Sequence, residues 1–233
     1  MTAILALLFL QADFTALYQQ AYEERLRTLG ENHAKTLESA RDLALHLAHR
    51  NEFDRAAPWL SRVLQAPSSN HPAAATALHN WAVAVEQQSP EQAERLYRLA
   101  LSIRVKTLPP LDAELALTRL NLAGMLVGNN SKEAIALAKA ALATFEKTLG
   151  ANHSYTGAAC GTLAAALGTT GDAVGAERLF RRAIIIAEKA HGPQSPETAA
   201  ALENLADLLS QTGREPEANR LRARAQAILR RQW

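Results

Sequence analysis

The chain has 233 residues and a formal net charge of +2 at pH 7, and 48% of its residues are hydrophobic but only 5% aromatic. So small a charge gives no strong field toward nucleic acid or a membrane surface, and we expect no nucleic-acid partner. The single cysteine, Cys160, excludes a disulfide within the chain and occupies an apolar helical position. We therefore expect a buried, inert thiol.

Residues 1–12 (MTAILALLFLQA) form an apolar run that is too short to span a bilayer as a helix. We therefore expect no transmembrane segment. The run suits the apolar region of a signal peptide with cleavage before Asp13, although no Lys or Arg precedes it. The alternative is an extra first helix. In the first case the protein would be exported, for example to a periplasm, and in the second it would be cytoplasmic.

Helical patterns follow in order from residue 14 onward. A helix over 14–29 matches the second half of a repeat, since Gly30 and His33 recur 120 residues later as Gly150 and His153. Apolar residues at helical spacing then predict successive hairpins, each with a first helix and a returning second helix. The half unit covers 14–33, and the full hairpins cover about 34–70, 71–110, 111–153, 154–195 and 196–233.

Prolines and glycines punctuate this pattern. Pro58 is expected in the first turn of its helix, where a missing N–H costs little. Ser195 followed by Pro196 is a well-formed helix start. The segment 168–171 (GTTG) is interpreted as a helix stop and turn, not as a phosphate-binding loop.

A shift of 42 residues superimposes the last two hairpins on each other. It aligns Thr156 with Thr198, Leu163 with Leu205, Gly171 with Gly213, Ala176 with Ala218 and Ala183 with Ala225. A repeat of this length indicates a solenoid whose units bury their faces against one another. The predicted fold class is all-α: a right-handed α-α superhelix of antiparallel helical hairpins, forming one solenoid domain over 13–233.

Four segments carry a resemblance to a known family: NLADLL from Asn204, NLAGML from Asn121, EKTLGANH from Glu146 and AERLFRRA from Ala176. Together they resemble the tetratricopeptide repeat (TPR) family, and their long period is most similar to the subclass found in kinesin light chains. The resemblance covers 14–229. It implies a non-catalytic scaffold that binds a peptide or a partner's segment in a concave groove lined by the first helices.

Alanines recur at one register position of each helix. We expect them to be buried, because small residues let two helix axes approach closely. They are Ala44, Ala82, Ala123, Ala164 and Ala206 on first helices and Ala56, Ala93, Ala134, Ala176 and Ala218 on second helices.

The resemblance also implies which side chains face the groove. Each first helix contains a Leu-Ala pair, which is Trp81-Ala82 in one of them, and the residue directly before this pair is expected to face the groove. In successive hairpins these residues are Asp42, Asn80, Asn121, Thr162 and Asn204. Amide side chains can donate to and accept from a peptide backbone. The alternative is that they bond locally or are merely solvated. Selectivity could come from the neighbouring Arg41, His79, Glu203 and Asp207.

The expected groove is mixed in charge and is lined by small residues around Ala158, Gly161 and Ala165. In this it differs from the basic grooves of kinesin light chains.

The sequence presents no catalytic or metal-binding motif. His33, His71 and His153 each follow an asparagine in a turn between hairpins, one per repeat, so they are too far apart to share an ion. No glycine-rich phosphate loop, nucleophile elbow or metal-ligand spacing occurs. We therefore expect no enzyme activity, no metal and no cofactor.

A second functional hypothesis stays open beside peptide binding. The half repeat near Phe14 would leave an apolar face uncovered if residues 1–12 were cleaved. Through this open end the solenoid could assemble into a homo-oligomer with a structural role.

Overall fold

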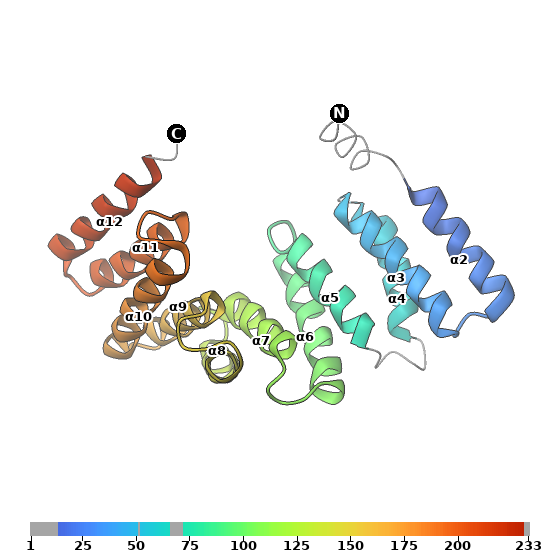
Figure 1. Ribbon diagram of the computed structural model, residues 1–233, viewed down its shortest axis with the longest axis horizontal. Coiled ribbons are helices and arrows are strands. Elements are labelled where there is room, and N and C mark those ends of the chain that lie inside the picture. The colour runs from blue at the N-terminus through green and yellow to red at the C-terminus, as the bar shows by residue number, and fades with distance from the viewer. Residues whose placement is uncertain (1–13, 51, 66–71, 231–233) are drawn as a thin grey trace. The chain divides into compact units, whose positions relative to one another are not determined.

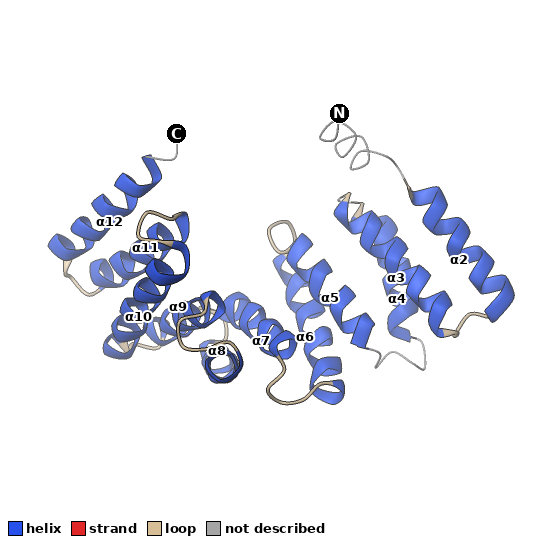
Figure 2. Ribbon diagram, in the orientation of Figure 1, coloured by secondary structure: helices blue, strands red, loops and turns tan. Residues whose placement is uncertain are grey.

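The computed structural model describes residues 14–50, 52–65 and 72–230. Over these ranges the elements are helices joined by short turns (Figure 2), which confirms the predicted all-α class. Residues 1–12, for which a signal peptide and an extra helix were the alternatives, lie outside the described residues. Across the described ranges, no helix is both long enough and apolar enough to cross a membrane.

The chain divides into two compact units between Thr107 and Leu108. Unit 1 holds α2 (Thr15–Leu29), α3 (Ala34–His49), α4 (Phe53–Gln65), α5 (Pro72–Val85) and α6 (Pro90–Thr107). Helix α3 packs between α2 and α4, and α5 pairs with α6 (Figure 1). The first helices α3 and α5 also contact each other, as stacked hairpins require.

Unit 2 holds α7 (Ala113–Leu126), α8 (Ser131–Thr148), α9 (Ser154–Thr169), α10 (Ala173–His191), α11 (Pro196–Gln211) and α12 (Glu215–Arg230). Each helix packs on the next in the chain, and the first helices α7, α9 and α11 contact one another in turn. This is the stacking of a helical-hairpin solenoid. The boundary between the units falls near the end of the hairpin predicted over 71–110, and a single domain over 13–233 stays a prediction.

The turns between hairpins repeat one set of interactions. Gly150 and Gly192 have φ values of 96° and 97°, a region that favours glycine because it has no Cβ. Six residues later, the hydroxyls of Thr156 and Thr198 donate to the carbonyl oxygens of these glycines at 2.8 Å in both cases. The 42-residue shift seen in the sequence is therefore also a repeated turn structure.

The core confirms the predicted register of small residues. All ten recurring alanines, on first and second helices alike, are at most 1% exposed. Between them lie larger side chains, of which Tyr97 is fully buried and Phe180 is 6% exposed. Cys160 is buried as expected, and burial raises the pKa of its thiol.

Pro58 corrects one expectation. Helix α4 begins at Phe53, so Pro58 lies in the helix interior and not in its first turn. The helix begins early because Glu52 accepts main-chain hydrogen bonds at its carbonyl oxygen from both Arg55 and Ala56. At 13 residues α4 is shorter than α6 or α8, each of 18. An interior proline removes one main-chain hydrogen bond, which is consistent with a short helix.

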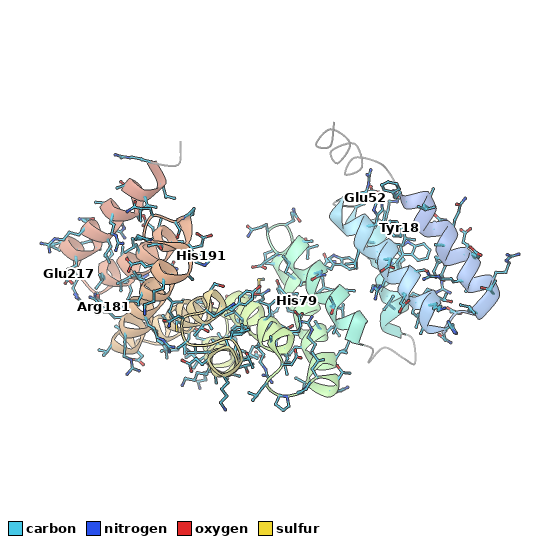
Figure 3. The ribbon with its side chains drawn as sticks, viewed as in Figure 1. Tyr18, Glu52, His79, Arg181, His191 and Glu217 are labelled. Atoms are coloured by element: carbon cyan, nitrogen blue, oxygen red, sulfur yellow. The ribbon has the colours of Figure 1, made fainter. Side chains whose placement is uncertain are left out.

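A buried polar cluster between α5 and α6 corrects a second expectation. His79, labelled in Figure 3 and predicted at the groove surface, is 5% exposed. Its ring packs edge-on against that of Tyr97, with ring centroids 5.4 Å apart. Arg104 is 1% exposed and donates to the hydroxyl of Thr76 at 3.3 Å. Burial, together with the charge of Arg104, lowers the pKa of His79 to about 4. His79 is therefore a core residue of unit 1.

Acid is expected to destabilise unit 1 through His79. Its pKa is about 4 in the folded protein against 6.5 for an unperturbed histidine. Between these values the unfolded chain binds more protons, so the free energy of unfolding rises with pH there. The contribution, about 3 kcal/mol at most, is complete above the unfolded pKa and is lost as the pH falls through the folded pKa.

Urea unfolding of the wild type and His79→Gln at about pH 7 and about pH 4.5 measures this difference. We expect the variant to lose clearly less stability on acidification than the wild type. Equal losses in the two proteins would show that other groups cause the pH dependence.

Candidate functional site

A cavity of about 430 Å³ lies in unit 2, where the first helices α9 and α11 and the second helix α10 come together. We call it the unit 2 cavity. Helices α9 and α11 each contribute a wall, and α10 contributes mainly apolar side chains. Its lining residues are Ser154, Tyr155, Gly157, Ala158, Gly161, Thr162, Phe180, Ala183, Ile186, Ala187, His191, Glu197, Ala200, Ala201 and Asn204.

Small residues leave the helix backbones close to the cavity, as the sequence predicted around Ala158 and Gly161. Two glycines on α9, one turn apart, have different roles. A Cβ on Gly157 would come within 2.9 Å of Cγ2 of the buried Ile186, so Gly157 is required by the packing of α9 on α10. A Cβ on Gly161 would meet no atom within 4 Å. Packing does not require Gly161, and its effect is to keep the cavity open.

Polar groups stand along both walls of the cavity. Thr162 on α9 and Asn204 on α11, both predicted as groove residues, line it together. Tyr155 also lines it, with its ring stacked on that of Phe145 at a centroid distance of 5.5 Å. His191, labelled in Figure 3, ends α10 and adds an exposed imidazole. The cavity thus offers hydroxyl, amide and imidazole groups above an apolar lining.

Glu197 is the one acidic residue of the cavity lining. Glu197 in the first turn of α11 is exposed, and within the described part of the chain its carboxylate forms no ion pair. Among the lining residues no Lys or Arg occurs. The cavity is therefore weakly acidic at neutral pH.

Unit 1 has a smaller cavity between its first helices. It measures about 280 Å³ and is lined by Arg41, Asp42, Leu45, Thr76 and Ala77. The two predicted residues in it are paired with each other, since Nη2 of Arg41 lies 2.7 Å from Oδ1 of Asp42. Asn80 is exposed on α5 and does not line this cavity.

The remaining predicted site residues lie in unit 2 but outside its cavity. Asn121 on α7 and Glu203 on α11 are half-buried. Asp207 is exposed and accepts a hydrogen bond from Arg222 of α12 at 3.0 Å. Of the nine predicted residues, the structure therefore brings together Thr162 with Asn204, and Arg41 with Asp42, and it buries His79.

Among the cavity residues that the sequence analysis missed, Tyr155, His191 and Glu197 carry polar groups that a ligand would meet. Two of them carried a signal, because Tyr155 precedes Thr162 by seven residues and Glu197 precedes Asn204 by seven. Seven residues are two helical turns, so both pairs share a helix face. His191 carried no such signal, since it belongs to a second helix.

The turn histidines have a structural role. Nδ1 of His33 accepts the main-chain N–H of Lys35 at 3.2 Å, and Nδ1 of His153 does the same for Tyr155 at 3.2 Å. Both act as helix N-caps. His71 lies outside the described residues. Within the described ranges no group of three or more His, Cys, Asp or Glu side chains could hold a metal ion.

Two family models with the description "Tetratricopeptide repeat" match the chain, one over residues 115–155 and the other over residues 158–231. Both matches lie in unit 2. The search of curated proteins found no match.

Solved structures share the fold. BtubC (BKLC) from P. vanneervenii is 19% identical with a TM-score of 0.71, covering 94% of this chain and 90% of that one. The TPR-like repeats of a kinesin light chain-type protein from Podosopora anserina are 24% identical with a TM-score of 0.67, covering 86% and 98%. MamA from Desulfovibrio magneticus RS-1 is 12% identical with a TM-score of 0.56, covering 95% and 98%.

Gly157 and Gly161 of α9 are expected to respond in opposite ways to substitution by alanine. Gly161→Ala should raise the free energy of unfolding by about 0.5–1 kcal/mol, because alanine is the better helix former and its Cβ meets nothing. Gly157→Ala should lower it by about 1–3 kcal/mol, because the new methyl group overpacks against Ile186.

Urea unfolding of both variants beside the wild type measures these changes. If the two variants shift in the same direction, the assigned difference between a packing glycine and a cavity glycine is wrong.

Proposed function

Since the chain is a tetratricopeptide repeat protein of the kinesin light chain-like type, we propose that it binds a peptide or a partner's segment in the unit 2 cavity. Tetratricopeptide repeats are protein-interaction scaffolds and are generally non-catalytic. The observation that carries the proposal is the unit 2 cavity itself. At Gly161 no side chain covers the backbone of α9, and the side chains of Thr162 and Asn204 form no hydrogen bond within the described residues.

The polar side chains of the cavity suit a peptide backbone. Within the described residues, neither Thr162 nor Asn204 forms a side-chain hydrogen bond. Each can both donate and accept, which is what the alternating N–H and C=O groups of an extended segment need. Thr162 is on α9 and Asn204 is on α11, which supports a segment that contacts both helices.

The dimensions of the cavity also suit a short segment. Its volume of about 430 Å³ is within the range of pockets that hold small ligands, and its lining is mostly apolar. Gly161 and Ala158 on one wall and Ala200 and Ala201 on the other let a backbone approach without a steric barrier. A scaffold held in this form requires little ordering on binding, which favours affinity.

Filling the cavity is expected to abolish binding without unfolding the protein. Gly161→Gln introduces a good helix former whose Cβ meets no atom within 4 Å, while its side chain occupies the cavity. The matched control is Ala136→Gln on the exposed side of α8, outside the cavity lining.

Quantitative mass spectrometry of proteins captured from the native source by the immobilised wild type and both variants provides the readout. At least one protein retained by the wild type and by Ala136→Gln should fall about tenfold with Gly161→Gln, a loss of about 1.4 kcal/mol. Equal capture by all three proteins would place the binding surface outside the cavity.

One observation favours the alternative, a structural solenoid that forms a homo-oligomer through its N-terminal half repeat. On α2, Leu17 is 61% exposed, and Tyr18, labelled in Figure 3, is 37% exposed. The ring of Tyr18 also contacts that of His46 on α3. Exposed apolar side chains on a terminal helix provide a surface on which a second copy could pack.

Multi-angle light scattering separates the two roles. For the peptide-binding role we expect one species at the monomer mass of 25.2 kDa over a range of protein concentrations. A mass that rises with concentration and returns to the monomer value in Leu17→Glu would favour the structural role instead.

A further inference from the structure

We infer that the unit 2 cavity selects a positively charged segment, in which a Lys or Arg accompanies a small apolar side chain, and that Glu197 recognises that charge. The inference rests on the proposed function and specifies the partner of the same cavity. It follows from the distribution of charge over the helices that form the cavity.

The two walls contribute acidic side chains and no basic ones. Helix α9 has no Asp, Glu, Lys or Arg from Ser154 to Thr169. Helix α11 carries Glu197, Glu203 and Asp207 but no Lys or Arg from Pro196 to Gln211. A charged partner in this cavity therefore meets only negative charge from the walls.

Two of these three carboxylates lie close to a cation of the protein. Asp207 accepts a hydrogen bond from Arg222 at 3.0 Å, and the charge of Glu203 helps to raise the pKa of the same guanidinium. Arg222 thus offsets the charge near the C-terminal half of α11. Glu197, seven residues before Asn204, has no such partner among the described residues. It is the uncompensated charge of the cavity.

None of the Lys and Arg residues of α10, which are Arg178, Arg181, Arg182 and Lys189, lines the cavity. Nη2 of Arg181 lies 2.7 Å from Oε1 of Glu177 on the same helix. Nη1 of Arg182 lies 2.6 Å from Oε1 of Glu146 on α8. Nζ of Lys189 donates to Oδ1 of Asn152 in the turn after α8 at 3.4 Å. Neither residue lines the cavity, where the other titratable side chains are His191 and Tyr155. The charge of Glu197 is therefore left for a ligand.

This arrangement discriminates between partners by charge. A Lys or Arg of the partner can form an ion pair with the carboxylate of Glu197. A guanidinium can also stack on the ring of Tyr155, which is 43% exposed. An acidic segment meets like charge at the same place. The alanine and glycine walls leave room for a small apolar residue beside the basic one.

The test is a selection of random decapeptides displayed on phage, using the immobilised full chain and discarding phage that also bind Gly161→Gln. We expect the retained peptides to be enriched in Lys and Arg over Asp and Glu. The affinity of a retained peptide should fall about 3- to 5-fold with Glu197→Gln, as for a partly exposed ion pair, and its binding should weaken with salt.

Two further variants sharpen the test. Glu203→Gln makes the same chemical change on the same helix but outside the cavity lining, and it should leave the affinity within about twofold. A selection repeated on Glu197→Lys should enrich Asp and Glu in place of Lys and Arg.

The outcomes separate this inference from the function on which it rests. Retained peptides that depend on Gly161 but have no basic bias, or that lose as much affinity with Glu203→Gln as with Glu197→Gln, would overturn the charge selectivity and leave peptide binding standing. If no peptide binds in a manner that depends on Gly161, both proposals fail.

Discussion

The structure depends on how closely neighbouring helices approach. At the recurring register positions the side chain is a single methyl group, and all ten alanines are at most 1% exposed. Close approach of this kind fixes the separation of each helix pair, and larger residues then fill the remaining space. Helix α8 has Ala138 at the position where α6 and α10 have Tyr97 and Phe180, and its Phe145, two turns later, is fully buried. Each unit is built by repeating this one packing geometry.

The unit 2 cavity is a consequence of the same packing. Helices α9 and α11 both pack on α10, whose Phe180, Ala183 and Ile186 are part of the apolar lining. Gly157 lets α9 rest on Ile186, and one turn later Gly161 leaves the backbone of the same helix open. On α9, one small residue therefore allows close packing against α10, and another leaves space for the cavity.

Charge is divided between the two kinds of helix in unit 2. The second helices carry ion pairs in a fixed register: Arg182 pairs with Glu146 at 2.6 Å, and 42 residues later Arg224 pairs with Glu188 at 2.5 Å. Exposed pairs of this kind add little stability each. Neither arginine of these two pairs lines the unit 2 cavity. The carboxylate of Glu197, which does line the cavity, has no ion-pair partner among the described residues.

The contrast between Asn204 and His79 shows which features of the site could be predicted from the sequence and which could not. The hairpins, the repeat period and the buried alanines could be predicted because they follow from the spacing of residues along single helices. The same spacing predicted that Asn204 and Thr162 face the groove. A helical register fixes the direction of a side chain, but whether that side chain is covered depends on a residue about twenty positions further along the chain. His79 is covered because Tyr97 and Arg104 of α6 are large enough to reach it. Asn204 is exposed and lines a cavity whose α9 and α11 residues include Gly161, Ala200 and Ala201. A polar residue in the groove register is therefore a site residue only where its neighbours are small.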